Sequence, residues 1–164
     1  MFETEVVIKG KHANYVDYLR NEKSANLFKR NMDVYLLAPF VGFYYNHKGE
    51  EDNSINTNTK IFADTVIREK LKLEFIYQTV MILHHEGSSK EKVKAAFDSS
   101  EHQVKENMEV FHSYTLGGIE KLYEKLVEES YDEEDYLNEL FSFIQEFNNE
   151  NTKEEIDILE LARQ

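Results

Sequence analysis

Apolar residues recur every third or fourth position along most of the chain, which is the spacing of α-helices that bury one face. In residues 27–46 this stripe falls at positions 28, 32, 36, 40 and 43, and residues 101–129 carry a longer one. Further periodic segments cover 12–22, 59–87, 88–100 and 132–150, and the tail 152–164 fits a final short helix. The pattern predicts an all-α protein, a compact bundle of about six helices in a single domain over residues 1–164.

The N-terminal segment TEVVIKG, residues 4–10, departs from this period. Its β-branched residues and the terminal Gly10 are typical of one short strand, although an extended arm fits equally well. A lone strand must pair its backbone groups with another strand, and the pattern predicts no second strand in the chain. Together with the abundant aromatic residues, 11 Phe and 10 Tyr, this favours pairing with another protein or with a second copy in a homodimer.

The stretch DVYLLAPFVGFYY, residues 33–45, is the most apolar part of the chain and holds its one proline, Pro39. The apolar run Val34–Tyr45 contains 12 residues, which is well short of the ~20 that cross a bilayer. We therefore expect a core helix that is kinked at Pro39, where the hydrogen bond to the carbonyl of Tyr35 is lost. Gly42 follows one turn later and permits a close backbone approach.

The longest predicted helix, residues 59–87, carries a wide apolar surface. A stripe with two flanking additions predicts a helix that is covered on more than one side. The stripe consists of Phe62, Val66, Leu73, Ile76, Val80 and Leu83, and the residues that widen it are Ile67, Leu71 and Phe75. In the segment 132–150, the predicted buried face consists of Leu137, Leu140, Phe141, Ile144 and Phe147.

Two adjacent glycines, Gly117 and Gly118, interrupt the stripe of residues 101–129. Each costs about 1 kcal/mol relative to alanine within a helix, so the pair indicates either a break between two helices or a very close contact. We expect a close helix–helix contact in which both glycines pack against the helix that bears Pro39 and Gly42. The polar, Asn- and Gly-rich residues 46–59 are predicted to form a long surface loop.

Composition narrows the class of protein further. The 164 residues include no cysteine, which excludes disulfides and thiolate zinc sites. The N-terminus lacks a basic start followed by a long apolar core, so no secretory signal is recognisable. We expect a cytoplasmic protein without a membrane-spanning segment.

The net charge of −13 is unevenly distributed. Residues 120–164 hold 15 acids and 4 bases, whereas the other 119 residues hold 17 acids and 15 bases. A candidate acidic interaction face consists of Glu128, Glu129, Asp132, Glu133, Glu134 and Asp135, although such a cluster also fits a solvated helix surface. A candidate basic segment consists of Lys9, Lys11, Arg20, Lys23, Lys29 and Arg30. The overall acidity opposes attraction to phosphate, so direct binding of nucleic acid is not expected.

Candidate chemistry is sparse. Glu109 and His112 have the Glu-x-x-His spacing of helical di-iron proteins, which require two such pairs, and no other histidine follows a glutamate by three residues. The sequence contains no G-x-S-x-G motif and no glycine-rich phosphate loop. We therefore predict no catalytic residues, metal or cofactor, and we keep a metal-dependent helical enzyme centred on Glu109 and His112 as an alternative.

Two segments resemble a known family. The first, LFKRNMDVYLLAPFVGFYYNHKGEE at residues 27–51, is similar to the pattern lFxtxxDVxxxAAxxGFxxgxr, and the second, FHSYTLGGIEKLYEKL at 111–126, is similar to a turn followed by GGlexLxexL. Both patterns are typical of small accessory proteins beside DNA phosphorothioation loci, the Dnd-type prokaryotic modification and defence systems. The matching positions are Phe28, Asp33, Ala38, Gly42, Phe43, Tyr114, Gly117, Gly118, Ile119 and Leu122. Pro39 departs from the pattern, and the resemblance covers about a quarter of the chain.

The resemblance implies a defence-associated accessory protein, and it supplies no catalytic residues. We therefore expect a non-enzymatic helical protein-interaction module, an accessory or regulatory protein of a prokaryotic DNA-modification or defence system. Its expected partner is another protein, such as part of a nucleic-acid-processing complex. One alternative is an acidic DNA mimic that inhibits a nucleic-acid-binding protein, because a rigid acidic face can imitate a phosphate backbone. The other is the metal-dependent helical enzyme.

Overall fold

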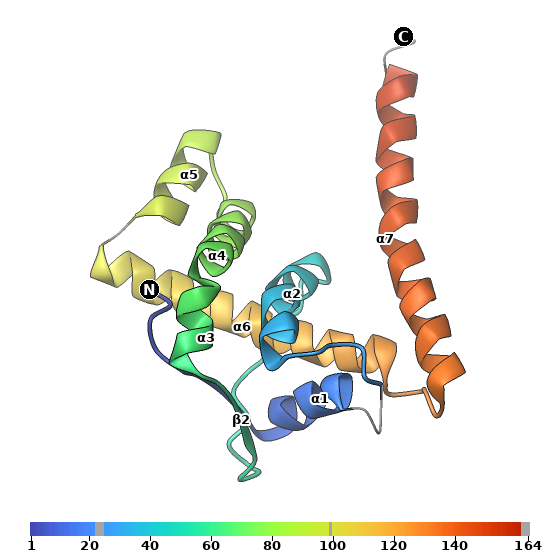
Figure 1. The fold of residues 1–164 in the computed structure, drawn as a ribbon. Coiled ribbons are helices and arrows are strands. Elements are labelled where there is room, and N and C mark those ends of the chain that lie inside the picture. Colours follow the sequence, from blue (N-terminus) through green and yellow to red (C-terminus); the bar gives the residue numbers. More distant parts are fainter. Residues whose placement is uncertain (22–24, 99, 162–164) are drawn as a thin grey trace.

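The structure, a computed structural model, describes residues 1–21, 25–98 and 100–161. Within these residues the chain is mainly helical, which confirms the predicted all-α class, and it adds one small sheet (Figure 1). The elements are β1 (Val6–Lys9), α1 (Gly10–Arg20), α2 (Asn31–Tyr44), β2 (Asn58–Ile61), α3 (Ala63–Arg68), α4 (Lys70–His84), α5 (Ser89–Phe97), α6 (Glu101–Leu126) and α7 (Glu133–Leu161).

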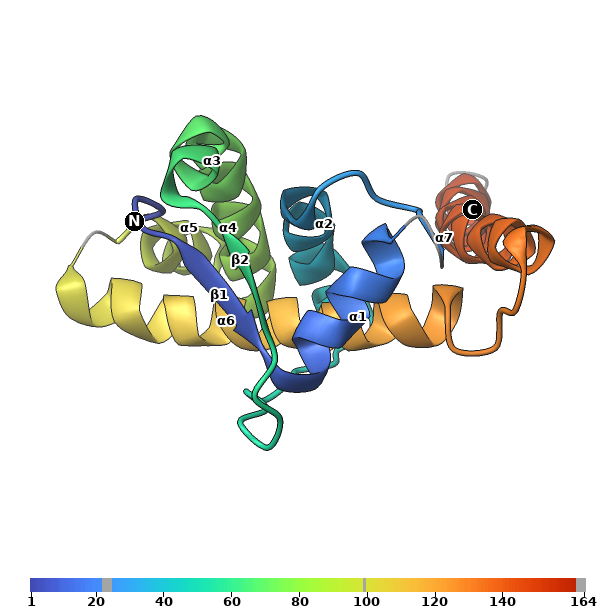
Figure 2. The same ribbon diagram turned by 60° about the horizontal axis from the view of Figure 1, so that its bottom comes forward.

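The long helix α6 is the centre of the fold. It packs against α1, α2, α4 and α7, and its contact with α2 is the most extensive between any two elements described. Figure 2 shows α6 running the width of the molecule, with α1 lying across it and α7 at its end. Phe111, Ile119 and Leu122 of α6 are fully buried, and full burial of such side chains stabilises the folded state by roughly 1.5–3 kcal/mol each.

The predicted strand pairs within the chain. β1 and β2 form an antiparallel two-stranded sheet in which Val6 lies opposite Ile61 and Lys9 lies opposite Asn58. The expectation that the strand needs a partner from another chain is therefore wrong. Residues 58–61 alternate in burial, with Ile61 inside and Lys60 outside, so this short segment follows the period of a strand and not that of the helix assigned to it from the sequence.

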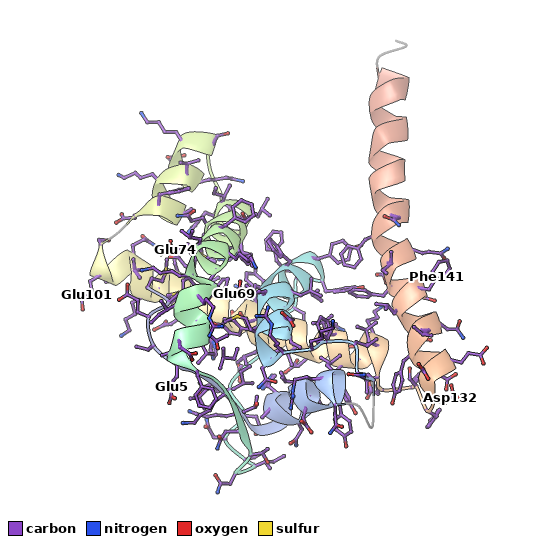
Figure 3. The ribbon with its side chains drawn as sticks, in the orientation of Figure 1. Glu5, Glu69, Glu74, Glu101, Asp132 and Phe141 are labelled. Carbon is purple, nitrogen blue, oxygen red and sulfur yellow. The ribbon has the colours of Figure 1, made fainter. Side chains whose placement is uncertain are left out.

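The predicted helix 59–87 is correspondingly divided into β2, α3 and α4. Glu69 both ends α3 and precedes α4, with a backbone conformation outside the helical region. Its carboxylate accepts hydrogen bonds from Arg30 at the start of α2 (3.1 Å) and from Lys72 (2.7 Å). Figure 3 shows Glu69 directed from this junction toward α2. The break thus falls where a side chain ties α3 and α4 to α2.

α6 continues through Gly117 and Gly118 without a break, which agrees with a close contact as the reason for the pair. α7 differs from expectation, because it extends into the predicted tail as one helix of 29 residues, Glu133–Leu161, and residues 162–164 of that tail lie outside the described residues. Asp132 precedes α7 and accepts backbone hydrogen bonds from Glu134 and Asp135, both at 3.0 Å. In Figure 1, the C-terminal part of α7 extends well beyond the other helices. No helix in the described parts of the chain combines the length and the apolar character that crossing a bilayer demands.

Candidate functional site

The outer surface of α3 and α4 carries a row of exposed apolar side chains, which we call the α3–α4 stripe. Its five members all belong to the surface that the sequence predicted to be covered, and most of them follow one another at or near helical spacing. The stripe consists of Phe62, Ile67, Leu71, Phe75 and Leu83, all more than half exposed. Leu71 is 83% exposed and Phe75 is 66% exposed. The predicted coverage of this side is therefore wrong within the chain. Only the opposite side of these helices, which includes Val66, Leu73 and Val80, is buried.

A shallow apolar pocket of about 420 Å³ lies along the middle of the stripe. Leu71, Phe75 and Ile76 of α4 and Leu36 of α2 form its apolar lining, and Lys72 completes it. The neighbouring polar group of Thr79 is satisfied within the helix, because its hydroxyl donates to the carbonyl of Phe75 at 2.8 Å. The middle of the stripe therefore presents an almost entirely apolar surface.

Basic side chains flank the stripe. Lys72 lines the pocket and Arg68 is the last residue of α3, and each is mostly exposed. Arg68 pairs with Asp64 and Lys72 pairs with Glu69, but exposed ion pairs of this kind contribute only about 0–1 kcal/mol. Their remaining N–H donors are available to an acidic group on a partner.

The predicted helix–helix contact is formed by α2 and α6. A methyl group added at Gly42 would lie 2.0 Å from the carbonyl oxygen of Tyr114, and one added at Gly118 would lie 1.8 Å from that of Ala38. These backbones touch, and any side chain at either position would separate the helices. Pro39 is buried beside Ala38, within α2.

Gly117 makes a different contact from the one expected. A methyl group there would lie 2.1 Å from the carbonyl oxygen of His47 and 2.9 Å from the backbone nitrogen of Gly49. The backbone N–H of Gly49 in turn donates to the carbonyl of Ser113 at 2.8 Å. Gly117 therefore contacts the loop that follows α2, whereas its neighbour Gly118 contacts α2 itself.

That loop also contributes to a polar cluster around Glu120 of α6. The Glu120 carboxylate accepts hydrogen bonds from His12 Nε2 (2.8 Å) and His47 Nε2 (2.6 Å) and lies 2.9 Å from Lys11 Nζ. Burial raises the pKa of Glu120, but the three donors from Lys11, His47 and His12 outweigh burial and bring the pKa below its ordinary value. The cluster ties α1, the loop and α6 together.

His12 is fully buried in this cluster. Burial lowers its pKa below the ordinary value, and the nearby Glu120 carboxylate opposes this only in part. A neutral His12 must carry its proton on Nε2, because the carboxylate can only accept. Its Nδ1 is then a bare acceptor, and this buried atom has no partner within the described structure. Lys11, His12 and His47 each direct a donor to the Glu120 carboxylate, so the cluster connects three segments of the chain.

The residues of the predicted basic segment lie at two separate places in the structure. Lys9 pairs with Glu51 at 3.4 Å and Lys11 pairs with Glu120, both beside the loop. Arg20, Lys29 and Arg30 instead line a second pocket, where Lys60 of β2 joins them. Lys23 lies outside the described residues.

The predicted acidic face spans the turn between α6 and α7 and the first turn of α7 (Figure 3, at Asp132). Glu128, Glu129, Asp132, Glu133 and Glu134 are exposed, and Asp135 is half-buried. Asp132 and Asp135 are used locally, since Asp132 caps α7 and Asp135 accepts from the backbone N–H of Tyr131 at 3.0 Å. A hollow of about 230 Å³ is lined by Glu124, Glu128, Glu129 and Glu139, with Lys125 as its one base.

The predicted Glu109–His112 pair is not joined by further ligands. Glu109 is exposed, and His112 lies 3.6 Å from Glu51 of the loop. Across the described ranges, no three His, Asp or Glu side chains come together in an arrangement that could hold a metal ion. Burial lowers the pKa of His112, against the effect of Glu51.

The buried face of α7 is rotated from the one predicted. Leu137, Phe141 and Ile144 are exposed, while Phe143 is buried and Phe147 packs against the ring of Tyr44 with centroids 4.2 Å apart. Phe141 lies on the opposite side of α2 from α4 (Figure 3). α7 therefore presents a second set of exposed apolar side chains that is separate from the α3–α4 stripe.

The sequence matches no protein-family model, and neither a curated protein nor a solved structure is significantly similar to it.

Proposed function

We propose that the chain is a helical protein-interaction module that binds its partner through the α3–α4 stripe. The observation that supports this is the exposure of five large apolar side chains on α3 and α4, two of which line a pocket with an almost entirely apolar surface. Large contiguous apolar surfaces on a soluble domain commonly mark sites of protein interaction. Complete burial of such a side chain is worth roughly 1.5–3 kcal/mol. Leu71 and Phe75 remain mostly exposed, so a partner would recover most of that value at each.

The partner that fits this surface is an amphipathic helix with acidic residues beside its apolar face. A helix laid along the stripe would place apolar residues at every third or fourth position against Leu71, Phe75 and the pocket beside Leu36. Acidic residues on its flank would meet Arg68 and Lys72. Such charge pairs at the rim mainly favour correct orientation and fast association.

We place this module in a prokaryotic DNA-modification or defence system, as a cytoplasmic accessory or regulatory protein. The support is the resemblance to proteins found beside Dnd-type loci, whose matching positions include Ala38, Gly42 and Gly118. These residues lie at the α2–α6 contact, away from the α3–α4 stripe. The partner that binds the stripe could belong to a nucleic-acid-processing complex.

Co-purification with paired variants tests the proposal. Leu71→Glu combined with Phe75→Glu places charge on the stripe, and Phe141→Glu places the same charge on an apolar residue of α7 that is 62% exposed. We expect a partner from the native host to be retained by the wild type and by Phe141→Glu, and to be lost from the double variant. Equal recovery with all three proteins, or no specific partner with any of them, would contradict the proposal.

Light scattering on the same proteins decides whether the partner is a second copy. If the stripe is covered in a homodimer, the wild type has twice the monomer mass and the double variant has the monomer mass. A monomeric wild type that still retains a different protein identifies a heterologous partner.

A second candidate function is mimicry of a nucleic-acid backbone by the acidic turn between α6 and α7. It is favoured by the hollow that is lined by Glu124 of α6, by Glu128 and Glu129 of the following turn and by Glu139 of α7. If this surface binds the target, reversal of Glu128, Glu129, Glu133 and Glu134 to lysine abolishes binding while the Leu71→Glu and Phe75→Glu variant retains it. The opposite pattern supports the α3–α4 stripe and eliminates mimicry.

A further inference from the structure

A pocket of about 340 Å³ lies where the end of α1, the start of α2, the end of β2 and the start of α3 meet. Four basic side chains line it: Arg20, Lys29, Arg30 and Lys60. No acidic side chain is part of the described lining, although the whole chain has a net charge of −13. We propose that this pocket binds the phosphate group of a nucleotide. Phe62 belongs both to this pocket and to the α3–α4 stripe, but the proposal does not depend on which partner binds the stripe.

The bases in the pocket retain donors that their acidic neighbours do not use. Arg30 donates through all three of its nitrogens to Asp33 and Glu69, but a guanidinium has five N–H groups. Two N–H groups of Arg30 therefore remain. Lys60 donates one hydrogen bond to Glu5, at 3.1 Å, and an ammonium group has three N–H groups.

The other two bases are less restrained. The guanidinium of Arg20 lies 3.6 Å from Asp17, beyond hydrogen-bond distance, and both side chains are substantially exposed. Lys29 has no ion-pair partner within the described residues. Because a phosphate carries several acceptor oxygens and suits arginine's forked geometry, it can engage these spare donors together.

An aromatic ring at the same pocket defines the ligand more closely. Phe62 lines the pocket and is 66% exposed. Exposed aromatic rings beside basic side chains provide stacking surfaces for nucleobases. Thr65 adds a neutral hydroxyl to the lining. A phosphate attached to a base, as in a nucleotide, would use both the cationic and the aromatic parts of the pocket.

The nucleotide could be free or could be the phosphorylated end of a single strand, and both share this chemistry. The test is an NMR titration of the full chain with inorganic phosphate, adenosine, adenosine 5′-monophosphate and a 5′-phosphorylated tetranucleotide. The methyl groups of Met32 and Ile61, which line the pocket, report binding at this place. We expect adenosine 5′-monophosphate to shift these resonances at concentrations at which adenosine does not.

Paired variants show which groups are responsible. Arg20→Gln with Lys29→Gln should weaken binding of adenosine 5′-monophosphate at least about tenfold, because hydrogen bonds to a charged group are lost. Lys94→Gln with Lys105→Gln removes the same charge from exposed positions of α5 and α6 and should leave binding unchanged. Phe62→Ala should weaken binding of the nucleotide but not of inorganic phosphate, and Phe62→Tyr should preserve both.

Each outcome bears on the proposal. Tighter binding of the tetranucleotide identifies a strand end as the ligand, and tighter binding of the mononucleotide identifies a free nucleotide. Equal binding of adenosine and its monophosphate would overturn the proposal. So would an unchanged affinity in the Arg20→Gln and Lys29→Gln variant, or shifts confined to residues remote from Met32 and Ile61.

Discussion

Substituting Gly118→Ala introduces a methyl group directly against the backbone of α2. In the structure this methyl carbon would lie 1.8 Å from the carbonyl oxygen of Ala38 and 2.5 Å from its carbonyl carbon. Ordinary van der Waals contact begins at 3.4 Å. The atoms that the new methyl group meets belong to the backbone of Ala38, so no side chain can rotate away to make room. The two helices must instead separate by about 1.6 Å along this line, the difference between 3.4 and 1.8 Å.

Two opposing effects set the magnitude. Replacing glycine by alanine inside a helix stabilises it by about 1 kcal/mol. Overpacking a close contact costs typically 1–3 kcal/mol and occasionally more, and the upper part of this range applies because α2 and α6 form the most extensive contact in the fold. The net loss is then about 2 kcal/mol, which lowers the melting temperature of a chain of this size by roughly 4–8 °C.

Thermal unfolding followed by circular dichroism measures this loss. Glu109→Ala, on the exposed face of the same helix, is the control and should change the melting temperature little. Because one widening of the α2–α6 spacing accommodates both new methyl groups, Gly42→Ala together with Gly118→Ala should cost less than the sum of the two single changes. A Gly118→Ala variant as stable as the wild type, or more stable, would refute the argument for backbone contact.

Three further predictions concern polar and exposed residues. Glu120→Gln should destabilise the fold by about 2 kcal/mol, measured by denaturant unfolding, because it removes a charged acceptor from three buried or half-buried donors. The pKa of His12, measured by NMR, should lie below 6.5 because of burial. Because this pKa is lowered on folding, the contribution of His12 to the free energy of unfolding is present above pH 6.5 and is lost as the pH falls through the folded-state pKa. Hydrogen bonds from Ser54 and from the backbone of Lys11 lower the pKa of Asp52 from 3.8 to about 2, so this contribution should be lost between about pH 4 and pH 2 and should be absent from Asp52→Asn at every pH.

Helical periodicity in the sequence was sufficient to predict the class of the fold, because most stripes are buried against α6. The stripe through Phe111, Ile119 and Leu122 is buried as its spacing indicates. The small sheet escaped prediction because residues 58–61 are too short and too polar to signal a strand without their partner. The pairing depends on β1, which lies about fifty residues earlier in the chain, and a local pattern cannot report it.

Coverage of a stripe is likewise not encoded in its spacing. Phe75 and Val80 are both apolar and lie on the same helix, yet one faces solvent and the other faces the core. Periodicity shows that a helix has an apolar surface, but the arrangement of the other helices decides how much of it is buried. The width of the stripe on residues 59–87 was a usable signal, since a surface wider than one neighbour can cover indicates either several neighbours or an external partner.

The polar sites depend on contacts between distant residues. Glu120 meets His47 and His12 from segments more than 70 residues away, and neither histidine stands at a recognisable spacing from it. The basic pocket recruits Lys60 from β2, outside the basic segment read from the sequence. Only the close approach at Gly42 and Gly118 could be predicted directly from the sequence. Glycine destabilises a helix relative to alanine, so its presence inside a helical pattern indicates a close contact or a break.

Site-specific photo-crosslinking in the native host tests the function of the α3–α4 stripe most directly. A photoreactive residue is placed at position 71, in the centre of the stripe, or at position 105, on an exposed face of α6. We predict that position 71 gives a discrete crosslinked species containing one other polypeptide and that position 105 does not. The absence of a crosslink at position 71, or the same products from both positions, would contradict the assignment of the stripe as a partner-binding surface.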